Sequence, residues 1–512
     1  MKTDALNATT DSGRLRFVLD GEVIELFDVD PTRTVLEFLR EDLGRTGTKE
    51  GCAEGDCGAC TVALAEPDPE GAGLRVRAVN SCIKFLPTLD GKELITVESL
   101  RAPDGRLHPV QQAMVECHGS QCGFCTPGFV MSMFALYKNA AAPTRREIDE
   151  ALAGNLCRCT GYAPIVRAAE AMYRLGAAEA EDRWLSAPHG SARGREDAAR
   201  RRARLESIRH TEALALEHEG RRFFAPASLD ALAELVATWP DATLLAGGTD
   251  VALWVTKALR DLPVVIYTGR VPELCEWRVT GDVIEIGAAV ALTDAMPPIL
   301  ADYPELEELL LRFASPPIRN AGTLGGNVAN GSPIGDSMPA LLAVHATLVL
   351  RKGNAMRELA LSDFYLAYRK TALQPGEFLV AVRIPRRRDG TLLRSYKVSK
   401  RFDQDISAVC AAFYLKLDGT RVAAFRAAYG GMAAVPQRAA HCEAALAGGE
   451  WSDAAVEQAM AALAQDFEPL TDMRSSAAYR RRVAANLLRR FRLETSGALG
   501  ATVYGYGRRK LA

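Results

Sequence analysis

The chain has 512 residues, more than one hydrophobic core usually supports, so we expect three or four domains. Hydrophobic residues make up 48% and charged residues 25%, as in globular proteins, and the net charge of −2 gives no reason to expect a nucleic acid as partner. No apolar run of 18 residues occurs, so we expect no membrane-spanning helix.

The first hundred residues predict a β-rich domain. Short apolar runs alternate with polar residues on both sides of Asp20-Gly21, a pair typical of a hairpin turn. A following segment has its apolar residues spaced as on one face of a helix. We expect strands at residues 15–19, 22–26, 61–64 and 74–79, and a helix at 34–42. This order of elements, with a cysteine-rich loop after the helix, predicts a β-grasp ferredoxin domain.

The loop after this helix holds the first of two cysteine sets. Its spacing, Cys52-x4-Cys57-x2-Cys60 with Cys82 after 21 further residues, is that of plant-type ferredoxins. The interleaved glycines allow a short loop to wrap an inorganic core, and its backbone N–H groups can then stabilise the sulfurs. The set therefore predicts a 2Fe–2S cluster.

The second set lies in a helical region, from about residue 108 to 175. Pro127 stands where proline favours a helix start, and Thr144 with Glu147 forms a capping-box pattern. We expect helices at residues 109–118, 128–138, one after Thr144, and 161–174. Two helix pairs with cysteine-bearing turns make a small four-helix domain, in which Cys122, Cys125, Cys157 and Cys159 would hold a second 2Fe–2S cluster.

Disulfides, zinc and buried thiols are the alternatives for these cysteines. Residues 1–20 contain no apolar stretch of the kind that directs export, so disulfides are disfavoured and a cytoplasmic location is expected. Zinc stays open for the second set, although the Cys157-x-Cys159 step fits a zinc knuckle poorly. Four cysteines receive no role, namely Cys117, Cys275, Cys410 and Cys442; of these, Cys117 lies near the second set.

Beyond residue 178 the composition changes twice. Residues 179–204 mix basic residues, acidic residues and alanine, which favours a solvated linker or exposed helix over a nucleic-acid patch. Residues from about 223 to 401 look α/β, and the last hundred alternate strands (409–417, 421–429) with helices (451–463, 477–493). The expected domains are 14–102 (plant-type ferredoxin), 103–178 (helical 2Fe–2S domain), 179–220 (linker), 221–400 (α/β FAD-binding domain) and 401–512 (C-terminal α+β flavoprotein domain).

Two glycine-rich loops, 244–250 and 321–333, suggest a phosphate-bearing cofactor. Glycines let backbone N–H groups approach phosphates, and threonine, serine and asparagine add further donors. Neither loop fits the dinucleotide or P-loop patterns, and each alone is weak evidence. A flavin is the expected cofactor, because one-electron clusters need a partner that exchanges both one and two electrons.

These motifs resemble those of the molybdenum hydroxylases, in particular the small iron–sulfur and FAD subunit of bacterial xanthine dehydrogenase. The resemblance runs over nearly the whole chain and is most specific in residues 51–60, 121–128, 154–162, 245–250 and 325–327. It implies that the second cysteine set lies nearer the molybdenum centre and the first nearer the flavin.

The resemblance also assigns individual residues. Gln121 would reach the pterin of a molybdenum cofactor held by a partner subunit. Residues from two segments would contact FAD, with the pyrophosphate cradled by the first of them: Leu245, Ala246, Gly247, Gly248, Thr249 and Asp250, then Thr323, Asn327, Asn330 and Ser332. Phe313 and Lys397 would lie near the isoalloxazine and Asp336 on the adenosine side; core packing is the alternative for Phe313, and a surface position for Lys397.

Since no molybdopterin-binding region occurs in the chain, a separate large subunit is expected, in a heterotetramer of two small and two large subunits. The implied activity is that of xanthine dehydrogenase, with electrons from hypoxanthine or xanthine hydroxylation to urate passing through both clusters to FAD and on to NAD. The same subunit could serve another hydroxylase acting on an aldehyde, an N-heterocycle or carbon monoxide, and a stand-alone iron–sulfur flavoprotein carrier is a further alternative.

Overall fold

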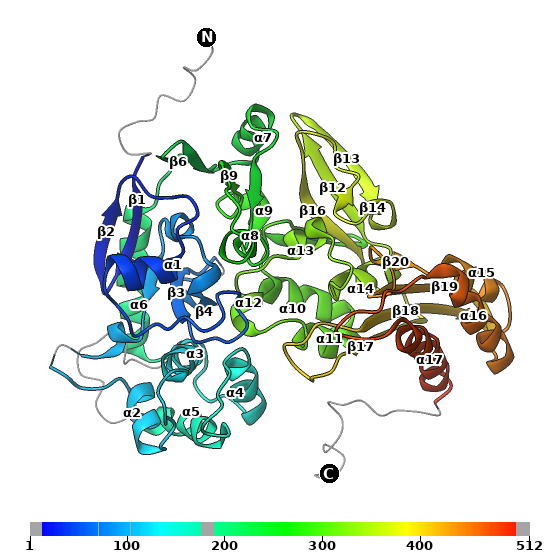
Figure 1. Ribbon diagram of the computed structural model, residues 1–512, viewed down its shortest axis with the longest axis horizontal. Coiled ribbons are helices and arrows are strands. Elements are labelled where there is room, and N and C mark those ends of the chain that lie inside the picture. The colour runs from blue at the N-terminus through cyan, green and yellow to red at the C-terminus, as the bar shows by residue number, and fades with distance from the viewer. Residues whose placement is uncertain (1–12, 70, 103, 176–188, 498–512) are drawn as a thin grey trace. The chain divides into compact units, whose positions relative to one another are not determined.

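The computed structural model describes residues 13–69, 71–102, 104–175 and 189–497 (Figure 1). The chain forms two compact units, each described by itself. Unit 1 comprises the residues up to Pro272 together with Ser315–Gly322, and unit 2 comprises Glu273–Ala314 and the residues from Thr323 onward. Among the described helices, none combines the length and apolar character needed to cross a membrane.

Unit 1 begins with a β-grasp sheet, as expected. In the described residues its strand order is β2-β1-β5-β3-β4, and β1 pairs with β2 in an antiparallel hairpin and with β5 in parallel. The strands are β1 (Leu15–Leu19), β2 (Glu22–Leu26), β3 (Thr61–Pro67), β4 (Leu74–Asn80) and β5 (Glu93–Ile95). Single 3-10 turns follow at η2 (Ser81–Ile83), η3 (Leu86–Leu89) and η4 (Glu98–Leu100).

The helix expected at residues 34–42 forms, but not as one regular α-helix. α1 (Val35–Glu37) begins with a capping box between Thr34 and Glu37, and the chain then widens into a π-helical turn, η1 (Phe38–Asp42). All four apolar residues that define the predicted face, Val35, Leu36, Phe38 and Leu39, are buried. The pattern thus gave the buried face correctly, while the wider turn depends on packing.

The helical region is confirmed. Pro127 lies in the first turn of its helix, and Thr144 and Glu147 form the expected capping box. The helices are α2 (Pro109–Glu116), α3 (Thr126–Asn139), α4 (Arg145–Leu152) and α5 (Ala163–Leu175). Their facing sides pack in one apolar core, which includes Phe134, Ile148 and Met172.

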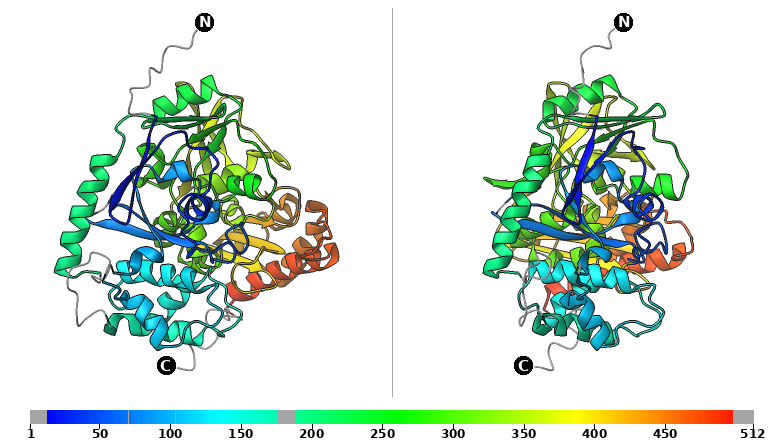
Figure 2. Two further views of the ribbon diagram at one scale, coloured as in Figure 1. Left: turned by 60° about the vertical axis from the view of Figure 1, so that its left-hand side comes forward. Right: turned by 90° about the vertical axis from the view of Figure 1, so that its left-hand side faces the viewer.

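Much of the segment interpreted as a solvated linker or exposed helix is a helix, and one side of that helix packs on the β-grasp sheet. Helix α6 (Ala192–Ile208) lies along these strands (Figure 2). Leu205 and Ile208 are buried against Val18, and Arg201 forms an ion pair with buried Glu93. The sequence did not reveal this buried face, because the segment is highly charged and one of its arginines forms a buried ion pair. Residues 179–188 lie outside the described residues.

A second sheet in unit 1 carries the first glycine loop. Its order is β6-β7-β9-β8, with β8 and β9 parallel. Its apolar side shares one core with the β-grasp sheet, including Phe17, Leu86 and Val265. The elements are β6 (Leu214–His218), β7 (Arg221–Ala225), α7 (Leu229–Thr238), β8 (Thr243–Leu245), α8 (Val251–Thr256), β9 (Val264–Tyr267) and α12 (Pro316–Arg319).

Unit 2 contains the remainder of the α/β region, built on an antiparallel sheet of order β10-β11-β16-β12-β13. Its strands are β10 (Trp277–Thr280), β11 (Val283–Gly287), β12 (Thr347–Lys352), β13 (Ala355–Ala360) and β16 (Glu377–Pro385), with a small pair β14 (Tyr365–Ala367) and β15 (Lys370–Thr371). The other elements are α9 (Pro272–Cys275), whose first residue belongs to unit 1, α10 (Leu292–Asp302), η5 (Pro304–Leu306), α11 (Glu307–Leu311), α13 (Leu324–Asn330), α14 (Ser337–Ala343) and η6 (Leu361–Asp363).

The second glycine-rich segment is therefore not simply a loop. Thr323 caps α13 by accepting a hydrogen bond from Gly326 N, and Gly331 ends it with a φ of 60°. Gly325 is needed for packing, since a Cβ there would lie 2.5 Å from the Ala288 backbone. Capping and close packing override the weak helix propensity of these glycines.

The C-terminal strands and helices agree with the sequence prediction. The sheet has the order β17-β18-β19-β20 and packs its apolar face on the last helices, with Phe413 and Phe491 in contact. The elements are β17 (Thr391–Val398), β18 (Val409–Asp418), β19 (Arg421–Gly430), β20 (Gln437–Arg438), α15 (Ala440–Leu446), α16 (Asp453–Asp466) and α17 (Ala477–Thr495).

Candidate iron–sulfur and flavin sites

The first cysteine set is gathered at one place in unit 1. Cys60 and Cys82 are buried with their sulfurs 3.2 Å apart, and Cys57 N donates to Cys52 Sγ over 3.4 Å. Contacts with Cys57 and Cys82 lower the pKa of the Cys52 thiol, while Cys52 raises the pKa of both partners. The thiols thus lie in two linked pairs, an arrangement that suits two irons with two thiolates each.

The second set lies at the surface of the helical domain. Cys122 and Cys159 are exposed and in contact, and Cys125 lies beside Cys157. Burial raises the pKa of Cys125 to about 12. Burial would also raise the pKa of Cys157, but hydrogen bonds from the Thr160 hydroxyl and backbone N–H outweigh it and lower that pKa. Here too the thiols pair two by two.

The alternatives for the cysteines can now be compared with the structure. All twelve cysteines are described, and each is a free thiol. No three His, Cys, Asp or Glu side chains among the described residues converge on a single-ion site. A 2Fe–2S core does not require that, because it holds its thiolates as two separate pairs. Cys117 is half-buried against the helical core, and Cys410 and Cys442 are fully buried.

The two cysteine loops touch through glycines. A Cβ on Gly128 would lie 2.1 Å from Gly58 O, and one on Gly58, whose φ is +72°, would lie 2.1 Å from Gly154 O. Any side chain at these positions would push the loops apart. The close approach lets Leu156 N donate to Cys57 O over 3.0 Å. One hydrogen bond therefore joins Cys57 of the first set to the residue that precedes Cys157 of the second.

The first set also adjoins the glycine loop that follows β8. Thr256 of α8 donates its hydroxyl proton to Ala53 O over 2.9 Å, and Lys257 Nζ donates to Cys52 O. A Cβ on Gly248 would lie 3.5 Å from the carbonyl oxygen of Ile83, which follows Cys82. The loop expected to hold the FAD pyrophosphate is thus in contact with the first cysteine set, inside one unit.

The loop itself fits a phosphate. Leu245 is buried, and its carbonyl accepts from Thr268 N over 2.8 Å, which fixes the end of β8. Within the described residues, no protein acceptor is found for the N–H groups of Gly247, Gly248 and Thr249. Gly248 has a φ of +84°, and a Cβ on Gly247 would lie 2.0 Å from Ala321 O. Free N–H groups in a glycine-lined concavity bind anions such as a pyrophosphate.

The remaining expected FAD residues of the second segment belong to unit 2 and gather around α13. Thr323 caps that helix, and Asn327 Oδ1 accepts a hydrogen bond from Ser337 Oγ over 2.5 Å. Asn330 is exposed at the end of the helix, and Ser332 follows it with its hydroxyl near Ile334 N, 3.4 Å away. Thr323 and Asn327 thus have hydrogen bonds inside the protein, which hold them in fixed orientations.

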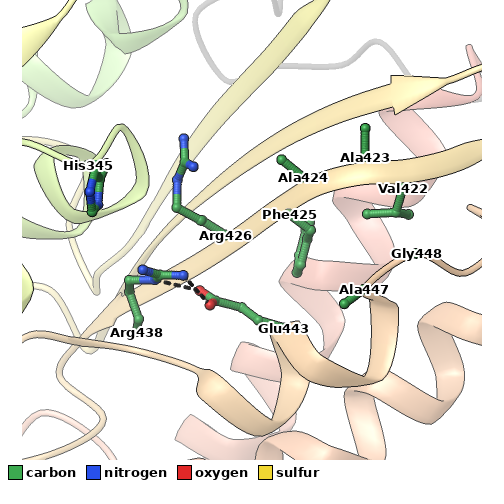
Figure 3. Close-up of a pocket in the computed structure, with 10 residues that line it drawn as sticks. All are labelled: His345, Val422, Ala423, Ala424, Phe425, Arg426, Arg438, Glu443, Ala447 and Gly448. Carbon is green, nitrogen blue, oxygen red and sulfur yellow. Dashed lines mark hydrogen bonds and ion pairs between the residues drawn. The ribbon is translucent and has the colours of Figure 1, made fainter.

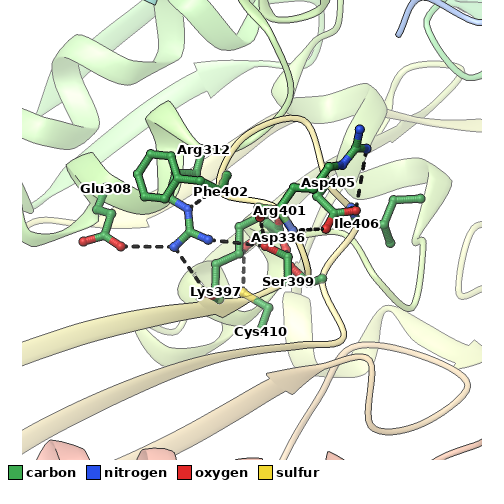
Figure 4. A network of polar contacts seen from close by, with 11 residues as sticks. Glu308, Arg312, Asp336, Lys397, Ser399, Arg401, Phe402, Asp405, Ile406 and Cys410 are labelled. Atoms are coloured by element: carbon green, nitrogen blue, oxygen red, sulfur yellow. Dashed lines mark hydrogen bonds and ion pairs between the residues drawn. The ribbon is translucent and has the colours of Figure 1, made fainter. Parts of the chain in front are cut away.

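Asp336 and Lys397, which the resemblance assigns to opposite ends of FAD, form a direct buried ion pair in unit 2 (Figure 4). Ser407 Oγ donates to the second Asp336 oxygen over 2.5 Å. Lys397 is not a surface lysine, since its side chain is 3% exposed. Both charges therefore belong to one network. Burial raises the pKa of the neighbouring Cys410 thiol.

A second part of this network fixes the loop after β17. The buried Arg312 guanidinium donates to Lys397 O, 3.2 Å away, and to Phe402 O, 3.0 Å away, and lies 4.7 Å from the Phe402 ring centroid (Figure 4). Asp405 accepts from Arg401 N over 2.7 Å. Next to Arg312, Phe313 is half-buried and packs against the unit 2 core.

Sequence reasoning missed several residues that support the clusters. Asn80 is 2% exposed and directs Nδ2 to Cys60 Sγ, 3.8 Å away. Asn155 donates to Ser132 Oγ over 2.7 Å and lies beside the Gly58–Gly128 contact. Tyr162 accepts from Cys157 N over 3.1 Å. Asn155 and Tyr162 lie in the motif at residues 154–162, but only the fold shows which groups they contact. Asn80, two residues before Cys82, lies in no motif.

Models of four protein families match successive parts of the chain. The matches are "2Fe-2S iron-sulfur cluster binding domain" (17–84), "2Fe-2S binding domain" (96–170), "FAD binding domain in molybdopterin dehydrogenase" (217–387) and "CO dehydrogenase flavoprotein C-terminal domain" (394–495). The second match resolves the zinc alternative in favour of an iron–sulfur cluster.

Curated relatives and solved structures agree with these models. Xanthine dehydrogenase of Emericella nidulans is 35% identical over 93% of this chain, and xanthine dehydrogenase 2 of Arabidopsis thaliana is 34% identical over 85%. The chain spans only 38% and 36% of their lengths. The structure of carbon monoxide dehydrogenase from Hydrogenophaga pseudoflava is 31% identical with a TM-score of 0.50, over 52% of this chain and 94% of that one.

Two 2Fe–2S domains followed by an FAD-binding domain define an iron–sulfur flavoprotein that transfers electrons. The cysteine pairs and the glycine loop have the shapes that these cofactors need. The chain belongs to the molybdenum hydroxylase family, of which it forms the iron–sulfur and FAD-binding part.

Proposed function

We propose that this chain is the electron-transfer subunit of a xanthine dehydrogenase, which takes electrons from a molybdenum-binding partner subunit and delivers them to NAD. The observation that carries the proposal is the hydrogen bond from Leu156 N to Cys57 O, 3.0 Å long. It gives a short bonded route between the two cysteine sets, and α8 continues the contact from the first set to the flavin loop.

The residues that would hold the cofactors are the eight cysteines and the two FAD segments. When bound, the clusters supply one-electron carriers, and FAD links them to a two-electron acceptor. The loop at Gly247–Thr249 would orient the FAD pyrophosphate through its free N–H groups, with Asn330, Ser332 and Phe313 as further contacts. We assign Asp336 and Lys397 a joint positioning role, because each neutralises the other.

The second cysteine set is the proposed entry point. Cys122 and Cys159 are exposed, and Gln121, Phe124 and Tyr162 around them are exposed as well. The exposed apolar rings of Phe124 and Tyr162 beside these sulfurs suit a protein partner better than water. We propose that a molybdenum-binding large subunit covers this surface, with Gln121 toward its pterin, in a heterotetramer of two small and two large subunits. We propose a cytoplasmic location for this chain because its described cysteines are free thiols.

We favour xanthine as the substrate of the assembly because relatives named xanthine dehydrogenase match a larger share of this chain. Relatives named xanthine dehydrogenase match 82–93% of this chain at 31–35% identity, whereas the carbon monoxide dehydrogenase chain matches 52%. A carbon monoxide hydroxylase is the second candidate, supported by that structural similarity at 31% identity. No residue of this chain is assigned to the substrate carbon in either case.

The test is to purify the chain with its native partner and assay metals, flavin and turnover. We expect four irons, one FAD and one molybdenum per pair of subunits, and reduction of the bound FAD by xanthine followed by NAD reduction. Reduction by carbon monoxide, and not by xanthine, would select the second candidate. Isolation of the chain alone, with iron and flavin but no molybdenum-bearing partner, would contradict both.

A matched pair of variants tests whether electrons reach FAD through the second cysteine set. Cys159→Ser is expected to lose half of the iron and nearly all xanthine-dependent reduction of FAD, while NADH still reduces a dye through FAD. Cys117→Ser, a half-buried cysteine outside both sets, is expected to keep its iron and turnover. Equal losses in the two variants would contradict the assigned ligands.

A further inference from the structure

A cavity of about 330 Å³ lies in unit 2, and none of its lining residues is assigned to a cluster or to FAD. It opens along strand β19, between the turn after α14 and the start of α15 (Figure 3). Its ionisable lining residues are His345, Arg426, Arg438 and Glu443, and its apolar wall includes Ala424 and Phe425. Its volume is that of a site for a small organic molecule.

One ion pair in this cavity is already satisfied. Arg438 donates two hydrogen bonds to Glu443, from Nε to Oε1 over 2.9 Å and from Nη2 to Oε2 over 2.5 Å. Glu443 Oε1 also accepts from Ala427 N over 2.9 Å. This pair closes one end of the cavity and contributes no net charge.

The guanidinium of Arg426 makes contacts of a different kind. Its guanidinium lies 3.9 Å from the centroid of the Tyr414 ring, and Nε donates to Ala343 O over 2.5 Å. Among the described residues it forms no ion pair with a carboxylate. Burial lowers the pKa of Arg426 although Tyr414 and Glu443 oppose it, so its environment is unfavourable to the charge that an arginine retains. A half-buried cation that forms no ion pair of its own is a group that an anion would stabilise.

The backbone beside Arg426 is also available. At one end of the cavity Val422 N donates to Gly449 O over 2.9 Å, and at the other Ala439 N donates to Ala427 O over 2.8 Å. Between these two contacts the outer edge of β19 has no strand partner in the described part of the sheet, since β20 pairs only with Ala428 and Tyr429. An open strand edge offers N–H and C=O groups to a ligand.

We propose that this cavity binds a small organic anion, whose phosphate or carboxylate group lies between Arg426 and His345 and whose apolar part packs on Ala424 and Phe425. Figure 3 shows the Arg426 side chain directed away from the Arg438–Glu443 pair, with His345 on the turn after α14. The site does not depend on the identity of the hydroxylase substrate.

The experiment is a calorimetric titration of the FAD-loaded protein with inorganic phosphate and, separately, with citrate. Saturating the flavin site first prevents the probes from binding at the Gly247–Thr249 loop. We expect one saturable site for at least one probe; binding of phosphate alone indicates a phosphate ligand, and of citrate alone a carboxylate. Arg426→Gln is expected to weaken binding at least tenfold, since it removes the charge-assisted contact.

The matched control is Arg481→Gln, which makes the same charge change at an exposed position on α17 and should leave the affinity unchanged. If Arg426→Gln does not fold, Arg426→Lys serves instead, because it keeps the charge and loses the planar donor fork; it should bind at least threefold more weakly. Absence of saturable binding by both probes, or equal affinity in the Arg426 and Arg481 variants, would overturn the proposal.

Discussion

Single side chains around the sulfurs lie close enough to influence clusters bound there. Asn80 is the clearest case, because its amide is buried and its Nδ2 points at Cys60 Sγ, 3.8 Å away. An N–H dipole directed at a thiolate favours the reduced, more negative form of a cluster. The residue therefore belongs to the redox site although it binds no iron.

We expect Asn80→Ala to lower the reduction potential of the first cluster. A hydrogen bond with a net value of about 0.5–1.5 kcal/mol corresponds to roughly 20–65 mV for a one-electron couple. Redox titration followed by electron paramagnetic resonance measures the change, and the second cluster, which Asn80 does not touch, is the internal control. An unaltered potential of the first cluster would show that the contact is only structural.

At the scale of elements, helix α6 explains how a highly charged segment becomes part of a folded unit. Arg201 donates from Nε and Nη2 to Glu93 Oε2 over 2.9 and 2.7 Å, and the Glu93 side chain is 2% exposed. Burial raises the pKa of Glu93 despite the opposing effect of Arg201. The helix is thus fixed to strand β5 by a pair that is largely removed from water.

Breaking this pair should be costly. Arg201→Met leaves the Glu93 carboxylate buried without its partner, and we expect the free energy of unfolding to fall by about 3–5 kcal/mol. Arg200→Met, one residue earlier and with a side chain that is 75% exposed, should cost less than about 1 kcal/mol. Urea unfolding followed by circular dichroism compares the two, and similar losses would mean that the α6 contact contributes little.

A second pair of elements makes a pH-dependent contact. Glu377, at the start of β16, accepts from Arg357 of β13 at both oxygens, over 2.7 and 2.8 Å, across β12. The hydrogen bond from Arg357 lowers the pKa of Glu377 although burial opposes it. Since the folded pKa is below the unfolded value of about 4.3, this stabilisation is present above that pH and is lost as the pH falls through the folded pKa.

We therefore expect Glu377→Gln to lower the thermal midpoint at pH 7, by an amount that shrinks as the pH approaches 4. Thermal unfolding of both proteins between pH 7 and pH 4 measures the difference. Glu358→Gln, at a side chain that is 58% exposed, is the control and should change the midpoint little at any pH. A difference for Glu377→Gln that stays constant over this range would exclude the Arg357 pairing as its cause.

At the scale of the whole molecule, function depends on the distance between the cysteine loops. The contact of Gly58 with Gly128 allows the hydrogen bond between Leu156 and Cys57. Electron transfer weakens steeply with separation, so a small displacement here should affect turnover without removing a cofactor.

Gly128→Ala tests this at a helical position where alanine is otherwise favourable. Its Cβ would lie 2.1 Å from Gly58 O, so the loops must separate. We expect xanthine-dependent dye reduction to fall about tenfold or more, while both cluster signals and NADH-dependent dye reduction persist. Gly73→Ala, just before β4 with no heavy atom within 4 Å of its Cβ, is the control. Unchanged turnover in Gly128→Ala would exclude this contact as part of the route.

Much of this fold was predictable because it depends on residue patterns within single segments of the chain. The two cysteine spacings, the Asp20-Gly21 hairpin and the Thr144–Glu147 capping box are each patterns within one stretch of the chain. The two 2Fe–2S domains, the hairpin and the capping box that they predict are confirmed. The prediction errors occur where contacts with residues distant in sequence determine the structure. The charges of α6 concealed a buried pair with Glu93, and the glycines of residues 324–330 concealed a short helix capped by Thr323.

The sequence by itself determined the two 2Fe–2S domains, the FAD-binding domain and the family, because thiolate spacing and apolar periodicity are properties of a single segment. Only the tertiary structure decided which segments meet: Leu156 with Cys57, Thr256 with Ala53, Asp336 with Lys397, and Arg426 with the Tyr414 ring. Such pairs join residues far apart in the chain. Their contact arises from the packing of whole elements, which no local pattern encodes.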